Sequence, residues 1–289
     1  MISVLVTGAN GLLGSTLVPA LRRNGIQITT CSRSNADISA DLADAGQAAT
    51  ALRAASPEVI VNLAAATNVD ECERAPQTAY LKNVRIVENL VGFIATESPG
   101  VHLVQISSDQ VYDGAGPHAE GEITLTNMYG FSKYSGELAA ARVPNTTLRI
   151  NFVGRSECPR RTTLSDWLVE QLSGGKVVTV FDDVRFSPLR LTTLAGFIEM
   201  AVRQRQIGTF NVGSHGSMSK AEFAFALAAE LGLPTSLMRR GRSTESEASA
   251  RRPSDMSMDS RRFEAAFGVT LPAIKDEIRL LRMEYLDET

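Results

Sequence analysis

A glycine-rich turn near the start of the chain constrains the fold most. Gly8, Gly11 and Gly14 follow the spacing G-x-x-G-x-x-G, a variant of the dinucleotide-binding fingerprint. The turn lies between an apolar run at residues 2–6, typical of a buried strand, and a helix predicted over residues 12–23. Glycine lets the backbone approach a pyrophosphate closely, and the helix N-terminus offers unpaired N–H groups and a favourable dipole. An ordinary tight turn is the alternative. We interpret the motif as a cofactor site formed by Gly8, Asn10, Gly11, Leu12 and Leu13.

Strand-like and helix-like stretches alternate through the first half of the chain. Apolar runs occur at residues 2–6, 26–31, 59–63, 101–106 and 146–150. Helical patterns separate them at residues 12–23, 44–55, 71–97 and 128–142. This alternation predicts an α/β fold with a doubly wound, Rossmann-like parallel sheet covered by helices.

The second half of the chain is less regular. Helices are predicted at 164–172, 191–205, 219–231 and 274–286, strands at 177–181 and 208–212, and a polar loop at 239–255. The last strand has the composition to join the first sheet. We therefore expect a dinucleotide-binding domain over residues 1–155, rejoined by about 189–214. Residues 156–289 are expected to form mainly a smaller C-terminal α/β lobe that binds substrate.

Composition excludes several classes of protein. The 289 residues carry 29 basic and 32 acidic side chains, and this net charge of −3 argues against a nucleic-acid-binding protein. No run of 18 apolar residues predicts a membrane span, and the start of the chain lacks the pattern of a signal peptide. The three cysteines are too far apart for a disulfide framework or a metal site. A cytoplasmic location is expected.

The residues after the second predicted strand bear on the choice of cofactor. Sites for NAD usually carry an acidic residue there, whereas sites for NADP use arginine near the 2′-phosphate. Here the strand ends in Cys31-Ser32-Arg33-Ser34. Arg33 could pair with a phosphate, and a solvated surface arginine is the alternative. We predict NADPH as the cofactor, with NADH as the second choice.

A tyrosine and a lysine four residues apart form the candidate catalytic pair. Tyr129 and Lys133 would share one face of a helix. A nearby positive charge is expected to lower the pKa of the phenol, which suits proton transfer to a carbonyl oxygen while a nicotinamide supplies hydride. Ser107 and Ser108 follow the fourth predicted strand, at a sheet edge where ligands bind, and either hydroxyl could bond the same carbonyl. The alternatives are a chance spacing and an ordinary turn.

These motifs together resemble those of extended short-chain dehydrogenases/reductases, and within that group the dTDP-4-dehydrorhamnose reductases. The resemblance covers nearly the whole chain and rests on four segments, 7–14, 59–66, 107–112 and 128–133. Later support comes from segments 185–188, 208–212 and 252–255.

The resemblance implies roles for individual residues. Ser108 matches the catalytic serine or threonine, Tyr129 the proton donor, and Lys133 the lysine that holds the nicotinamide ribose. The cofactor is further implied to contact Asp41 and Leu42 near the adenine, and Ala64 and Ala65 beyond the third strand.

Substrate contacts are expected from several places in the chain. Asn83 stands where the family has an asparagine near the active site, and Asn151 and Phe152 follow the fifth strand, where substrate contacts begin. Arg185 lies in one of the later matching segments. Arg252 belongs to an arginine-rich region that could clamp a nucleotide diphosphate, although a solvated loop is the alternative.

No metal is expected. Thr16 stands where some family members have an acidic magnesium ligand. The three histidines, at positions 102, 118 and 215, show no metal-binding spacing.

The sequence therefore predicts NADPH-dependent reduction of a 4-keto group on a nucleotide-linked deoxysugar. Two alternatives stay open. One is a non-catalytic NADP-binding regulatory subunit, because the family resembles the regulatory β subunit of methionine adenosyltransferase. The other is a sugar-nucleotide epimerase. We expect a nucleotide sugar as the partner, with neither nucleic acid nor membrane, and a monomer or homodimer. The base, the sugar and the product stereochemistry do not follow from the sequence.

Overall fold

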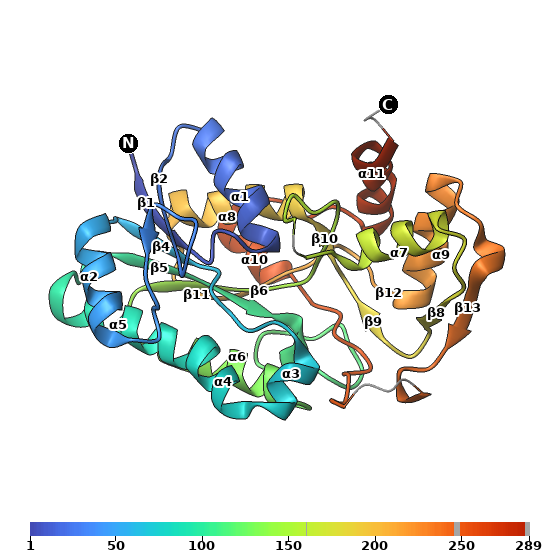
Figure 1. Cartoon of the computed structure of the whole chain (residues 1–289), viewed down its shortest axis with the longest axis horizontal. Coiled ribbons are helices and arrows are strands. Elements are labelled where there is room, and N and C mark those ends of the chain that lie inside the picture. The colour runs from blue at the N-terminus through green and yellow to red at the C-terminus, as the bar shows by residue number, and fades with distance from the viewer. Residues whose placement is uncertain (160, 246–248, 287–289) are drawn as a thin grey trace.

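The computed structural model describes residues 1–159, 161–245 and 249–286. Its central sheet contains β1 (Ser3–Thr7), β2 (Gln27–Ser32), β3 (Ile38–Ser39), β4 (Val59–Asn62), β5 (His102–Ser108), β6 (Asn145–Ile150) and β11 (Gly208–Val212). The seven strands lie in the order β11-β6-β5-β4-β1-β2-β3, and all neighbours are parallel. The strand order reverses between β1 and β4, and such a switch point opens a crevice at the carboxyl ends of the strands. The predicted doubly wound α/β fold is confirmed (Figure 1).

The inner strands of this sheet are buried along their whole length. Every residue of β4, β5 and β6 is buried, which explains why their sequences lack alternation between polar and apolar residues. The last predicted strand, 208–212, is β11, and it pairs with β6 in the same sheet.

Helices cover both faces of the sheet (Figure 1). One face packs against α1 (Leu12–Arg23), α8 (Leu191–Gln204) and α10 (Arg261–Phe267). The other packs against α2 (Ala45–Ala55), α5 (Ile86–Glu97) and α6 (Met128–Ala140). Each face buries a separate cluster of Leu, Ile, Val and Ala side chains, and this burial of apolar surface stabilises the layered arrangement.

The prediction of one helical stretch over residues 71–97 is wrong. The region divides into α3 (Val69–Arg74), α4 (Pro76–Tyr80), a π-helical turn (Leu81–Arg85) and α5. Pro76 has no N–H to continue α3, and it starts α4 at the first helical position, where that N–H is not needed. The π-helical turn then places one extra residue in the helix before α5.

A smaller α/β lobe lies beside the carboxyl edge of the sheet (Figure 1). Its helices are α7 (Leu164–Ser173), α9 (Lys220–Leu231) and α11 (Ile274–Leu286). Its short strand pairs are β8 (Val178–Phe181) with β13 (Met238–Gly241), β9 (Arg185–Phe186) with β12 (Met218–Ser219), and β7 (Phe152–Val153) with β10 (Leu189–Arg190). Most of these elements share a third apolar core, whereas Leu189 of β10 packs in the core that contains α1 and α8.

The predicted loop over residues 239–255 is partly wrong, because β13 begins at Met238 and pairs in parallel with β8. Only every second side chain of so short a strand contacts the core, and Met238 alone is buried, so the sequence shows no clear strand pattern. Single 3₁₀ turns complete the described elements at Asp109–Val111, Thr235–Leu237 and Ser243–Glu245. Within the described ranges, no helix combines the length and hydrophobicity needed to span a membrane.

Candidate active site

A cavity of about 1770 Å³ opens at the carboxyl edge of the sheet, and we call it the central pocket. Its lining begins with the glycine turn and the loop after β2, continues through the loop after β4, and includes the ends of β5 and β6. Phe186 and Lys220 contribute from the smaller lobe. Pockets for one small molecule commonly have volumes of ~300–1000 Å³, so the central pocket has room for two ligands side by side.

The glycine turn has the geometry of a phosphate cradle. Gly8 has a φ of +66°, and a Cβ added there would lie 2.8 Å from the backbone nitrogen of Ala64. A Cβ on Gly14 would lie 2.3 Å from the carbonyl oxygen of Ala9, so α1 packs directly against the turn. Gly11 caps α1 without a side chain, and the first turn of the helix holds no acidic residue. The N–H groups of Leu12 and Leu13 are therefore open to an anion.

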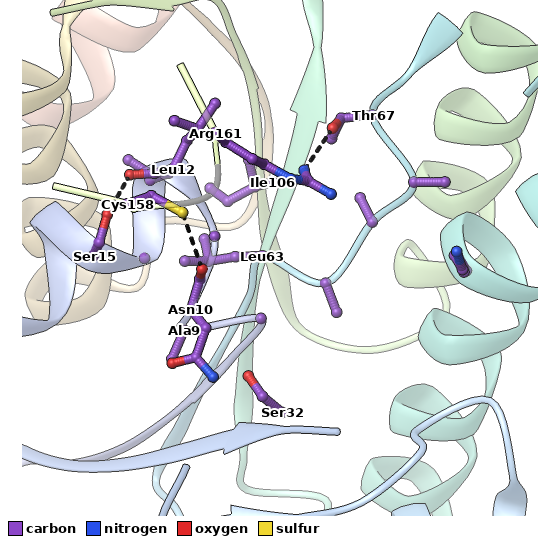
Figure 2. Close-up of a pocket in the computed structure, with 18 of the residues that line it drawn as sticks. Ala9, Asn10, Leu12, Ser15, Ser32, Leu63, Thr67, Ile106, Cys158 and Arg161 are labelled. Atoms are coloured by element: carbon purple, nitrogen blue, oxygen red, sulfur yellow. Dashed lines mark hydrogen bonds between the residues drawn. The ribbon is translucent and has the colours of Figure 1, made fainter. Parts of the chain in front are cut away.

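Asn10 fixes the loop after β2 against this turn. Its side-chain nitrogen donates to the carbonyl oxygens of Ser34 (2.8 Å) and Asn35 (3.0 Å). The carbonyl oxygen of Asn10 accepts a hydrogen bond from the thiol of Cys158, over 3.4 Å (Figure 2). Asn10 thus holds three segments of the pocket wall together.

The segment that follows β7 closes one side of the pocket, and the sequence did not identify it as functional. Cys158 reaches the glycine turn, and Arg161 donates to the hydroxyl of Thr67 over 3.0 Å, in the loop after β4 (Figure 2). Both residues line the pocket. Arg161 therefore places a positive charge at the wall opposite the helix N-terminus of α1.

Charged side chains surround the loop after β2. Arg33 is exposed and lines the pocket, as does Arg22 from α1. An acidic residue, Asp37, also lies here, five residues beyond the end of β2, so it was not evident from the strand end. Its carboxylate accepts hydrogen bonds from the N–H and hydroxyl of Thr30, each over 2.8 Å, and lies 3.5 Å from Arg22. The hydrogen bonds from Thr30 hold the pKa of Asp37 below its usual value.

The remaining predicted cofactor residues also line the pocket. Leu42 is buried, and the Asp41 carboxylate accepts from the N–H of Ala43 over 3.0 Å. The N–H of Ala64 points toward the side chains of Asn62 (3.3 Å) and Thr7 (3.4 Å). Ala65 continues the wall beyond it.

Ser108 and Tyr129 meet at the inner end of the pocket. Ser108 is the last residue of β5, and its hydroxyl lies close enough to the phenol of Tyr129 to lower the pKa of that phenol. Tyr129 is the second residue of α6, which is capped by the side chain of Asn127. A Cβ on Gly130 would lie 2.3 Å from the carbonyl oxygen of Gln110, so this glycine lets α6 approach the turn after β5 closely.

The protonation of Tyr129 differs from the sequence prediction. Burial raises the pKa of the Tyr129 phenol to about 12, against the effect of the neighbouring Ser108 hydroxyl, and the negative charge of Asp109 raises it further. The predicted lowering by Lys133 is wrong for this pocket, because removal of the phenol from water has the largest effect on its pKa. Tyr129 is therefore protonated at neutral pH and can act as an acid.

Lys133 lies one helical turn beyond Tyr129 and lines the same pocket. Its ammonium donates to the carbonyl oxygen of Ile106 over 2.6 Å. Burial lowers the pKa of Lys133 to about 8, and the nearby carboxylate of Glu137 opposes this effect. Lys133 is therefore mainly charged at neutral pH.

A second polar cluster lies beside Tyr129, and its lysine was not predicted. Asp109 is buried, and its two carboxylate oxygens accept hydrogen bonds from Ser108 and from the side chain of Asn151. Burial raises the pKa of Asp109 to about 6. The positive charge of Lys220, from the smaller lobe, acts on this carboxylate and opposes that rise. Asp109 directly follows the predicted serines, whereas no local pattern singles out Lys220.

The structure brings only some of the predicted substrate residues to the pocket. Asn151 and Phe152 line it. Ser107 also lines it, but its hydroxyl donates to Glu137, whose carboxylate pairs with the buried guanidinium of Arg149.

Three other predicted residues are absent from the described part of the pocket wall. Asn83 accepts from the N–H of Ala66 (2.7 Å) and donates to Ser132 (2.8 Å), so it positions the loop after β4 against α6. Arg185 pairs with Glu222 over 3.3 Å, and Arg252 pairs with Asp70 over 2.5 Å. Each arginine is thus engaged with a carboxylate.

No group of three or more His, Cys, Asp or Glu residues suited to a metal ion occurs among the residues that the structure describes. Thr16, which stands at the position considered for a magnesium ligand, has a buried hydroxyl without a hydrogen-bond partner in that part of the chain.

Comparison with known proteins finds similar sequences over nearly the whole chain. The sequence model of the family described as RmlD substrate binding domain matches residues 2–286. A dTDP-4-dehydrorhamnose reductase from Sinorhizobium fredii is 31% identical over 96% of this chain and 95% of its own. The β subunit of methionine adenosyltransferase 2 from Bos taurus is 30% identical over 90% of this chain and 81% of its own.

A solved structure shares the fold. The dTDP-4-dehydrorhamnose reductase from Bacillus anthracis, in complex with NADP, superposes with a TM-score of 0.88 at 23% identity, over 98% of this chain and 99% of that one.

Proposed function

Because the chain belongs to the RmlD substrate binding domain family, we propose that it is a reductase of nucleotide-linked sugars. The reaction is NADPH-dependent reduction of a 4-keto group on a deoxysugar carried by a nucleotide. One observation carries the proposal: Ser108 and the protonated Tyr129 lie close together and line the same pocket as a glycine cradle. This arrangement provides an acid for a carbonyl oxygen beside a site for a dinucleotide.

The residues of the pocket fit a phosphorylated dinucleotide. The cradle between Gly8, Gly14 and the start of α1 leaves no space for a Cβ and presents N–H groups suited to a pyrophosphate. Arg22 and Arg33 provide positive charge for a 2′-phosphate, while the Asp37 carboxylate already bonds Thr30. The remaining contacts are assigned to Asp41, Leu42, Ala64 and Ala65. NADPH would supply hydride to the carbonyl carbon.

The chain's own groups would handle the proton. Ser108 orients the carbonyl oxygen through its hydroxyl, and Tyr129 donates the proton that this oxygen gains. Lys133, one turn further along α6, stabilises the phenolate that is left and binds the nicotinamide ribose. Asn151 and Phe152 are assigned to the substrate. Asn83 holds the surrounding backbone and Ser107 holds Glu137, so both residues act indirectly, by positioning these neighbours.

The same proposal assigns the two parts of the molecule to different ligands. Residues 1–155 with 189–214 would bind the dinucleotide, and the rest of 156–289 mainly the sugar nucleotide. Arg185 and Arg252 stay candidates for substrate binding only if their carboxylate partners release them. A cytoplasmic location and a monomer or homodimer stay predictions.

Steady consumption of NADPH tests the proposal. We expect the protein to oxidise NADPH when a 4-keto sugar nucleotide such as dTDP-4-dehydrorhamnose is added. Tyr129→Phe should lower kcat by about 100-fold or more, the usual contribution of a general acid, while NADPH binding stays nearly unchanged. Phe131→Tyr, at an exposed position of α6, is a control that leaves turnover unchanged.

Other outcomes would favour the alternatives. Binding of NADPH without consumption, together with stable co-purification of another enzyme, would favour a regulatory subunit. Interconversion of sugar nucleotides without net loss of NADPH would favour an epimerase. Full activity of Tyr129→Phe would reject the assigned acid.

A further inference from the structure

Two groups of opposite charge, Asp109 and Lys220, lie within electrostatic reach of each other in the central pocket, and they belong to different parts of the chain. Burial lowers the pKa of Lys220, the charge of Asp109 opposes this effect, and the charge of Arg252 adds to it. Asp109 follows β5 in the large sheet, and Lys220 is the first residue of α9 in the smaller lobe. Both line the pocket, and each acts electrostatically on the other. The proposed acid, Tyr129, lies in the field of the same carboxylate.

Lys220 is held in place by the helix that it starts. Ser219 and Glu222 form a capping box, in which the Ser219 hydroxyl accepts from the N–H of Glu222 over 3.0 Å. The Glu222 carboxylate accepts from the N–H of Ser219 over 2.7 Å. The backbone N–H of Lys220 donates to the carbonyl oxygen of Val184 over 2.8 Å. The backbone of Lys220 is thus fixed, and the residue forms part of the pocket wall.

The ammonium of Lys220 has no hydrogen bond to any residue that the structure describes, and no ion pair joins it directly to Asp109. Among the residues that the structure describes, side chains donate one hydrogen bond to each carboxylate oxygen of Asp109, from Ser108 and from Asn151. Each carboxylate oxygen can accept more than one. The ammonium of Lys220 can therefore still donate hydrogen bonds, and the carboxylate of Asp109 can still accept them.

A hydroxyl group is the ligand that can bond to both Lys220 and Asp109. Its oxygen accepts from an ammonium while its proton is donated to a carboxylate. An anionic substituent would be attracted by Lys220 but repelled by Asp109, and an apolar one would leave both charges without partners. The ring hydroxyls of a sugar have the required chemistry, and the neighbouring Tyr129 places this point close to the carbonyl being reduced.

We propose that Lys220 and Asp109 together bind a sugar hydroxyl next to the 4-keto group, so that the smaller lobe selects the sugar. This inference rests on the proposed function, because it assumes that the sugar ring occupies the inner end of the pocket. It adds a specificity-determining residue, Lys220, that supplies no proton to the ketone.

The test compares two substrates in three proteins. The substrates are a 4-keto sugar nucleotide with a hydroxyl on the carbon beside the ketone, and the same compound lacking that hydroxyl. The proteins are the unmodified chain, Lys220→Met, and the control Lys275→Met, which changes an exposed lysine at the start of α11. Lys220→Met should lower kcat/KM for the hydroxylated substrate by about 10- to 100-fold, the worth of a hydrogen bond to a charged group.

For the substrate that lacks the hydroxyl, Lys220→Met should lower kcat/KM less than about threefold, because this substrate makes no such bond. Lys275→Met should change neither value, and NADPH affinity should be the same in all three proteins. Equal losses on both substrates, or a loss of NADPH binding, would overturn the inference. Asp109→Asn, which keeps the shape of the side chain, should reduce the preference in the same direction, and the double variant should lose less than the sum of the two.

A binding measurement separates this inference from the proposed function. Calorimetric titration of both nucleotide sugars into the NADP-loaded protein measures selection of the hydroxyl without turnover. If the unmodified chain binds the hydroxylated compound more tightly and Lys220→Met abolishes this difference, the inference holds even when no NADPH is consumed. If the unmodified chain binds both compounds equally, the inference fails even when both are reduced. If it binds neither, both proposals fail.

Discussion

Ser107 and Ser108 are adjacent at the end of β5, yet their hydroxyl groups have different partners. Ser107 bonds to Glu137, which is paired with the buried guanidinium of Arg149 over 2.6 Å. Ser108 donates to Asp109 and lies beside Tyr129 at the pocket. The first serine therefore contributes to a buried polar network, where unpaired groups would be costly, and the second remains available to a ligand.

The pKa of Lys133 gives a prediction at this scale. Because burial lowers that pKa to about 8, the ammonium is charged below pH 8 and becomes neutral above it, while the phenol of Tyr129 stays protonated up to about 12. We expect kcat/KM for NADPH to fall as the pH rises through about 8. Lys133→Arg should move the fall to higher pH, because a guanidinium keeps its charge. A profile that stays level well above this pH would contradict the role of Lys133.

Arg33 provides a second prediction for a single residue. Its exposed guanidinium lines the pocket beside the loop after β2, where a 2′-phosphate would lie. Arg33→Ala should weaken NADPH binding by about 10-fold or more, the worth of a charge-assisted contact, and NADH binding by much less. Fluorescence titration with both cofactors measures this difference. Equal loss for both would refute the assignment.

At the scale of elements, the turn between β1 and α1 depends on glycine, whereas the middle of α5 does not. Gly8 combines a positive φ with contact to the backbone of Ala64, whereas Gly92 lies in α5 with open space where a Cβ would be. Gly8→Ala should destabilise the fold by ~1–3 kcal/mol through backbone strain and weaken NADPH binding. Gly92→Ala should stabilise it by ~0.5–1 kcal/mol, because alanine loses less entropy in a helix. Urea unfolding measures both, and similar effects of the two changes would contradict this account.

Elements with strong local signals were predicted well from sequence. The helix at 12–23 and the strand at 208–212 have the predicted bounds, because glycine turns and apolar periodicity define their ends. The π-helical turn after Tyr80 and the strand β13 were missed, since each depends on packing against distant elements. Propensity and periodicity within a short window carry no information on such contacts.

The residues of the candidate site also differ in how well the sequence predicted them. Ser108, Tyr129 and Lys133 were identified because they lie in short motifs that the resemblance also covers. The pKa of Tyr129 was predicted in the wrong direction, because burial of the phenol depends on the whole fold. Lys220 was missed for the same reason: its place in the pocket follows from how the smaller lobe, which contains α9, lies beside the sheet.

At the scale of the whole molecule, the pocket is formed where the small lobe lies beside the carboxyl edge of the sheet (Figure 1). The sheet provides the glycine turn and the Ser108–Tyr129 pair, and the lobe provides Phe186 and Lys220. Neither part contains the complete set. Contacts to the dinucleotide and contacts to the sugar can therefore change separately, through residues on different elements.

The return of the chain from the lobe to β11 has a consequence for protein engineering. A fragment that stops at residue 155 would lose the strand beside β6 and the helices α8 and α10, leaving an open sheet edge and an uncovered apolar surface. Such a fragment would tend to aggregate. Grafting a foreign sugar-selecting module onto this scaffold therefore requires splice points on both sides of the segment that contains α8 and β11, and on both sides of α10.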